Sequence, residues 1–187
     1  MKHKPHRKPV FSIHSDGQGS SVGRVRACAK GFMHQPNSAE ELVGLGFRYW
    51  MRGCQTGNVD HWAQAWTLYS GRLGCQTAKT IIGELSSWVR LVNSRTQRSI
   101  HVADEGCAQF CADECLAVSM IAASQHKTCP AIRACAFALI EDSMIEEVVD
   151  QSDSFATMLI ASDQVLSPRS ILAGDISSLS PASGTYQ

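Results

Sequence analysis

Apolar residues recur every three or four positions through the middle of this chain, and this spacing most constrains its fold. Between residues 37 and 166 no segment alternates apolar and polar side chains for long, and no Asn-Gly or Asp-Gly turn joins two β-branched runs. The first pattern indicates amphipathic helices, whereas half-buried strands need alternation. The sequence therefore predicts an all-α fold, an antiparallel helical bundle of about four main helices with one or two shorter ones.

Start and stop signals indicate where the first helices lie. Asn37-Ser38, followed by two glutamates, predicts a helix that ends near Gly53 or Gly57. A second start lies at Asn58 or Asp60. Glycines 71 and 74 then favour either one kinked helix or two helices, 59–71 and 75–94. The second helix is expected to bury an apolar stripe formed by Trp62, Trp66, Tyr69 and Leu73.

Two further main helices are expected in the second half of the chain. One runs from about Val102 to Gln125, and the other starts at Thr128-Cys129-Pro130, with proline in the first turn. The latter is apolar on two faces, which predicts a central position in the bundle. The polar residues 151–154 are expected to interrupt it before a last short helix.

The two ends of the chain differ in composition from the middle. Residues 1–36 contain three prolines and a Gly/Ser cluster, which predicts a flexible arm, and residues 167–187 form a Ser/Pro/Gly-rich tail. The helical domain is therefore expected at 37–166. Residues 1–30 contain seven basic side chains and one acidic one, Asp16. Such an arm either binds an acidic partner surface or nucleic acid, or is only a solvated tail. Its first basic residues are Lys2, Lys4, Arg7 and Lys8.

The formal net charge of zero conceals a division along the chain. Residues 1–100 carry 14 basic and 5 acidic side chains, while residues 101–187 carry 3 basic and 12 acidic ones. A neutral total argues against a strongly basic nucleic-acid module. There is no apolar run long enough to span a membrane and no secretory signal at the start, so we expect a cytoplasmic protein with reduced cysteines.

Potential soft-metal ligands gather in the second half of the chain. Cys107, Cys111 and Cys115 follow at intervals of four, which places the first two on one face of the expected helix. The remaining candidates are His126, Cys129 and Cys135. Thiolates on adjacent helical turns suit Cu(I) or Zn²⁺ bound between helices. Free cysteine is also among the most buried residue types, so the alternative is that these thiols only pack in the core.

In pattern, the C-x₃-C spacing on a bundle helix resembles the cysteine-rich four-helix copper-storage proteins. The resemblance covers about 29 residues, from Cys107 to Cys135, and implies copper held by thiols that line several helices. Cys54 and Cys75 stand singly, which departs from that pattern. The spacings of c-type haem attachment and of ferredoxin clusters are absent, as are the Glu-x-x-His pairs of di-iron bundles.

Other side chains allow more than one interpretation. Asp104 and Glu114 fall near the cysteine stripe, where a carboxylate is either a ligand, a group of raised pKa, or a solvated flank. The basic half interleaves arginines with aromatic residues, a set found in binding hot spots and in single-stranded nucleic-acid sites, but also in cores. Its members are Phe47, Arg48, Tyr49, Trp50, Arg52, Trp62, Trp66, Tyr69, Arg72, Trp88 and Arg90.

Three functional hypotheses follow from these patterns. The sequence contains no hydrolase elbow, phosphate-binding loop or dinucleotide fingerprint, so an enzyme is not the first interpretation. The first is a small cytoplasmic helical regulatory or adaptor protein that binds a macromolecular partner, most simply another protein. The second is a thiol-rich bundle that binds Cu(I) or Zn²⁺ or senses redox state. The third is an enzyme with an unrecognised Cys/His site.

Overall fold

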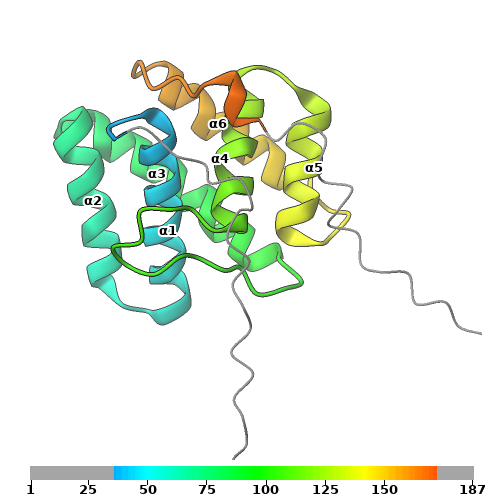
Figure 1. The fold of residues 1–187 in the computed structure, drawn as a ribbon, viewed down its shortest axis with the longest axis horizontal. Coiled ribbons are helices and arrows are strands. Elements are labelled where there is room, and N and C mark those ends of the chain that lie inside the picture. Colours follow the sequence, from blue (N-terminus) through cyan, green and yellow to red (C-terminus); the bar gives the residue numbers. More distant parts are fainter. Residues whose placement is uncertain (1–35, 172–187) are drawn as a thin grey trace, which may run out of the picture.

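The computed structural model describes residues 36–171 of the 187-residue chain, and this part is all-α. It contains six α-helices, one 3₁₀ turn and no strand, so the all-α part of the predicted fold class is confirmed (Figure 1). None of the helices in this part of the chain is both long and apolar enough to cross a membrane. The elements are α1 (Ala39–Thr56), α2 (Val59–Leu73), α3 (Cys75–Arg95), α4 (Ala112–Gln125), α5 (Cys129–Ile140), α6 (Glu146–Ile160) and η1 (Pro168–Ser170).

The first three helices begin and end where the sequence signals indicate. The Ser38 hydroxyl accepts a hydrogen bond from the Glu41 N–H at the start of α1, and left-handed Gly57 ends that helix. Asn58 caps α2 through the Asp60 N–H. Gly74, with φ 77°, separates α2 from α3, so the stretch folds as two helices rather than one kinked helix.

Three expectations about the number and the bounds of the helices are wrong. The helix expected from Val102 begins only at Ala112, and residues 96–111 form a connecting loop instead. The expected interruption at 151–154 lies inside α6, while the chain breaks at 141–145, where Glu141 takes a left-handed conformation with φ 52° and ends α5. Six helices of comparable length therefore replace the expected four main ones.

Helix α4, and not α5, occupies the centre of the fold. Its residues 113–124 are all buried, and it packs against α1, α5 and α6 (Figure 1). A helix that is covered on every side needs apolar or satisfied polar groups all round. By contrast, α5 buries one stripe and leaves Phe137 exposed, so the prediction of a central α5 is corrected.

Helix α2 also differs from the expected pattern. It buries His61, Ala65 and Tyr69, a stripe that is rotated from the apolar one, and Trp66 remains 40% exposed. The Tyr69 hydroxyl reaches α1 and donates to the Leu42 carbonyl at 3.1 Å. The fully buried face of α2 is therefore a narrow one.

The segment after α6 is bound to the helices through residue 171. The buried Glu40 carboxylate accepts hydrogen bonds from the Ser167 N–H at 2.6 Å and from the Ser170 hydroxyl at 3.0 Å. Burial opposes ionisation of Glu40, but these hydrogen bonds outweigh it and lower the pKa. Packed structure thus continues beyond 166, where the sequence placed the end of the helical domain. Lys2, Lys4, Arg7 and Lys8 lie outside the described residues.

Candidate functional site

The loop between α3 and α4, residues 96–111, is the longest stretch without a helix between two helices of the described chain. In Figure 1 it is green and crosses in front of α1 toward α2. Connections in compact domains usually span a few residues, and loops longer than about 12–15 residues without secondary structure are uncommon and often functional. How this loop is held therefore bears on what the molecule does.

A buried ion pair lies beneath the loop. Arg48 of α1 donates from Nε to Glu114 Oε1 at 2.6 Å and from Nη2 to Oε2 at 3.1 Å. The two side chains are only 2% and 0% exposed. Burial alone would lower the pKa of the Arg48 guanidinium, but the hydrogen bond and charge of Glu114 outweigh it and raise that pKa. The raised pKa keeps the Arg48 guanidinium charged in the folded protein.

The remaining hydrogen-bonding capacity of this pair is used on the loop backbone. Arg48 donates to the carbonyl oxygens of Cys107 at 2.7 Å and Gln109 at 2.9 Å. Glu114 accepts from the N–H groups of Ala103 at 3.1 Å and Cys111 at 2.7 Å. An ion pair that binds four backbone groups at separate points along a loop defines the path of that loop.

Phe110 anchors the same loop against α1. Its ring lies under the Arg48 guanidinium, 5.5 Å from the guanidinium carbon to the ring centroid, and is nearly fully buried. The ring occupies the space that a side chain at position 44 would need, since a Cβ on Gly44 would lie 2.2 Å from it. Glycine at this position lets the loop approach the helix backbone.

A second ion pair holds the beginning of the loop. Arg98 binds Asp113 through two parallel hydrogen bonds of 2.7 and 2.9 Å, and this contact raises the pKa of Arg98. The same carboxylate accepts the His101 N–H at 2.7 Å. The adjacent carboxylates of Asp113 and Glu114 thus bind both halves of the loop. Both lie in the first turn of α4, and the positive end of the helix dipole at that turn favours negative charge.

These anchors leave a tip exposed to solvent, formed by residues 104–109. The tip makes two further contacts to neighbouring helices. Arg52 of α1 donates to Asp104 at 3.0 Å, and His61 of α2 lies with Nδ1 3.0 Å from a Glu105 carboxylate oxygen. Gly106, with φ 80°, makes the turn between them and Cys107. The arrangement displays a short acidic turn in one conformation.

The structure distributes the six predicted metal ligands over different surroundings. Cys107 and Cys129 are exposed, the first in the loop tip and the second at the start of α5. Cys111, Cys115 and Cys135 are buried. Because Cys107 precedes α4 and Cys111 is its N-cap, the three thiols expected on one helix do not lie on one helix.

The buried thiols and the histidine have protein partners. Cys111 donates to the His101 carbonyl at 3.1 Å, and Cys135 contacts the Ser119 hydroxyl at 3.4 Å. Burial raises the pKa of Cys111 to about 12 and raises that of Cys135. His126 Nε2 lies 2.8 Å from the Leu166 carbonyl, on the segment after α6.

Within residues 36–171, no three Cys, His, Asp or Glu side chains are grouped as a metal ion would require. Metal sites for Zn²⁺ and Cu(I) need three or four such ligands within bonding distance. Binding of Cu(I) or Zn²⁺ by Cys107, Cys111, Cys115, His126, Cys129 and Cys135 stays a prediction and gains no support from this geometry.

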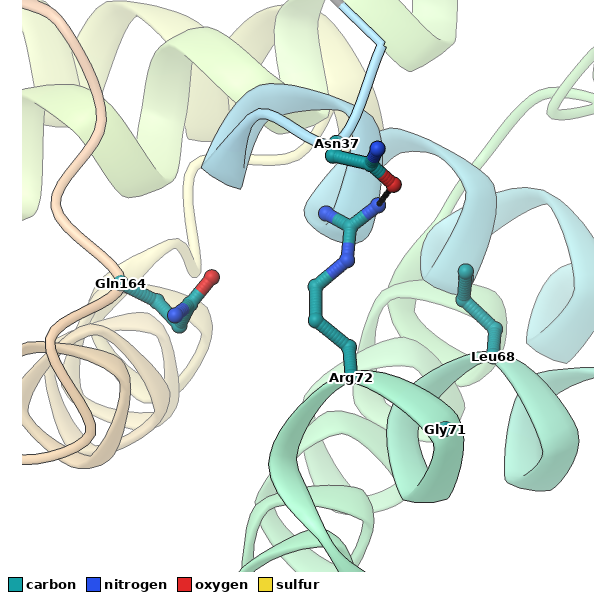
Figure 2. Close-up of a pocket in the computed structure, with 5 residues that line it drawn as sticks. All are labelled: Asn37, Leu68, Gly71, Arg72 and Gln164. Carbon is teal, nitrogen blue, oxygen red and sulfur yellow. Dashed lines mark hydrogen bonds between the residues drawn. The ribbon is translucent and has the colours of Figure 1, made fainter.

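A surface hollow of about 420 Å³ lies beside α2 (Figure 2). In the close-up, Arg72 reaches from α2 toward Asn37, with Gln164 on the opposite side. The guanidinium is used for structure, since it donates to the Ser38 carbonyl at 2.6 Å and to Glu41 at 2.7 Å. The lining holds no thiol, carboxylate or imidazole, so the hollow does not supply the groups of the hypothetical Cys/His enzyme.

Sequence reasoning singled out Glu114 and the arginine–aromatic set but did not pair them. Arg48 belonged to that set, while Arg98 and Asp113 were not recognised at all. A signal for the start of α4 was present, because Glu114 follows Cys111 by three residues, the spacing of a capping box. Of the two carboxylates near the cysteine stripe, Glu114 is buried and paired, whereas Asp104 is solvated.

Comparison of the chain with protein-family models, with curated protein sequences and with solved structures finds no match.

Proposed function

We propose that this chain is a small cytoplasmic adaptor or regulatory protein that binds a protein partner through the tip of the α3–α4 loop, residues 104–109. One observation carries the proposal: the two carboxylates at the start of α4 are each paired with an arginine, and together they accept hydrogen bonds from three backbone N–H groups of an otherwise irregular loop. Loops positioned by a rigid scaffold are common sites of binding.

The energetics of the buried pair support this interpretation. Removing two charges from water costs about as much free energy as their attraction returns, so a buried ion pair is weak evidence for added stability. What Arg48 and Glu114 do accomplish is to fix the loop path through the bonds to Cys107, Gln109, Ala103 and Cys111. A loop held in its binding conformation loses less entropy on association.

The chemistry of the tip indicates the kind of partner surface. Asp104 and Glu105 are acidic, and the following residues, Gly106, Cys107 and Ala108, are small. Charges at the rim of an interface speed encounter and select partners more than they add affinity. A basic patch on the partner with room for a tight turn is therefore the complementary surface.

Site-specific photocrosslinking in cells tests the proposal. A benzophenone amino acid in place of exposed Gln109 should give a discrete crosslinked product, and one in place of exposed Gln76 on α3 should not. The Glu105→Arg change, made in the Gln109 crosslinking variant, should abolish the product because it removes the net negative charge of the tip. The same product from both positions, or none from Gln109, would refute binding through the tip.

We further propose that the basic arm, residues 1–30, contributes to binding of the same partner. Deleting residues 1–30 should weaken capture of the crosslinked partner, and the loss should shrink at high salt, where charges that are more than about 8–10 Å apart are screened. Unchanged capture at low salt would remove the arm from the interaction.

A further inference from the structure

A second candidate surface is formed by one flank of α2. We propose that this flank pairs with the same flank of a second copy of the chain to form a weak two-fold dimer. The flank consists of Val59, Trp62, Trp66 and Leu73. At 100° per residue these four positions fall within about 60° of one another on the helix, and their centre lies about 90° from that of the buried stripe.

The fold leaves this row partly uncovered. Val59 is 64% exposed and Trp66 is 40% exposed, while Trp62 and Leu73 are half-buried against the core. Single apolar side chains on a surface need no explanation, but Val59, Trp62 and Trp66 are neighbours on successive turns of α2, and a row that contains tryptophan is typical of an interface. The row is about 21 Å long, from the helical rise of about 1.5 Å per residue.

The lack of charge on this flank permits an identical partner. Residues 61–71 of α2 contain no Asp, Glu, Lys or Arg, so two copies of the flank can meet without placing like charges opposite each other. Most exposed helix faces carry such charges, and these would repel one another across a two-fold axis.

The order of residues along the row is self-complementary. Val59 and Leu73 each lie seven residues, or two turns, from Trp66. In an antiparallel pair with the two-fold axis at Trp66, Val59 of each copy therefore meets Leu73 of the other. The small residues Ala63 and Ser70 border the row on its outer side and allow the two helices to approach closely.

The size of the row sets the expected strength. One helix flank buries well under the roughly 800 Å² per partner of a standard interface. We therefore expect a dissociation constant of about 10–500 μM, because small interfaces retain little free energy after the loss of translational and rotational freedom.

Sedimentation equilibrium of the full chain at about 5–500 μM tests the proposal. The weight-average mass should rise from 20.3 kDa toward twice that value as concentration increases. The Ala63→Lys variant places two like charges beside the two-fold axis and should raise the dissociation constant at least tenfold. Gln64→Lys, the matched control, adds the same charge at an exposed neighbouring residue on the opposite flank and should leave association unchanged.

A Trp66→Glu variant provides a second test, and Phe137→Glu, a change at an exposed apolar residue of α5, provides its control. Circular dichroism should show all four variants folded. Loss of the dimer in Ala63→Lys and Trp66→Glu, with retention in both controls, supports the proposal. A wild-type chain that stays monomeric to 500 μM, variants that associate equally well, or controls that also lose the dimer would each overturn it.

Discussion

Arg48 on α1 and Glu114 on α4 are 66 residues apart in the chain, yet their side chains bond at 2.6 Å with almost no exposure to solvent. The arginine comes from the basic half of the sequence and the glutamate from the acidic half. Opposite charges from the two halves of the sequence are thus paired inside the fold, beneath the loop that we propose as the partner-binding site.

Removing one member of this pair should be costly. Arg48→Met leaves the Glu114 carboxylate buried without its counter-charge, and we expect the free energy of unfolding to fall by about 3–5 kcal/mol. The double variant Arg48→Met/Glu114→Leu should be less destabilised than the sum of the two single variants, because neither charge is then left unpaired. Urea denaturation measures all three, and additive losses would contradict coupling between the two side chains.

Gly44 should tolerate no side chain, because a Cβ there would lie 2.2 Å from the Phe110 ring. We expect Gly44→Ala to displace the ring and lower the free energy of unfolding by about 1–3 kcal/mol. Gly83 on α3 is the matched control, since a Cβ at that position has no atom within 4 Å. Gly83→Ala should stabilise by about 0.5–1 kcal/mol through the helix propensity of alanine. Equal effects at both positions would refute the close approach of Phe110.

The cysteines should differ in reactivity toward a thiol reagent at pH 8. Cys107 is exposed and should react quickly, whereas Cys111 is buried with its pKa raised to about 12 and should react only after unfolding. Mass mapping of the labelled residues in native and denatured protein separates the two. Rapid labelling of Cys111 in the native protein would show that the loop does not cover it.

Glu40 should make stability depend on acidity. Its folded pKa lies below the ordinary value of 4.5, so its contribution is complete above that value and is lost as the pH falls through the lowered pKa. We expect Glu40→Gln to lower stability by about 1–2 kcal/mol at pH 7 and to flatten the decline below pH 5. Asp150→Asn, at an exposed position on α6, is the control. Identical acid profiles for wild type and Glu40→Gln would contradict this role.

Local signals in the sequence predicted the helix ends that depend on neighbouring residues. Ser38 and Asn58 cap their helices, and Gly57 and Gly74 end or separate them, because capping and left-handed turns involve only a few adjacent residues. The all-α class followed from the same kind of information, namely the spacing of apolar side chains.

The loop could not be predicted because its order depends on a distant helix. Phe110, Cys111 and Cys115 continue a helical apolar pattern, so the sequence favoured a helix from Val102. In the fold Phe110 packs against Gly44 of α1, a contact across 66 positions that periodicity does not encode. The apolar pattern likewise misplaced Trp66, since α2 is oriented by Tyr69 and its contact with Leu42.

Hydrogen exchange at the amides of Ala103 and Cys111 tests the central claim most directly, because both N–H groups donate to Glu114. If the buried ion pair holds the α3–α4 loop in one conformation, these amides should exchange slowly in the wild-type protein and at least tenfold faster in Arg48→Met. Exchange at the rate of an unstructured peptide in the wild type, or equal protection in Arg48→Met, would contradict the claim.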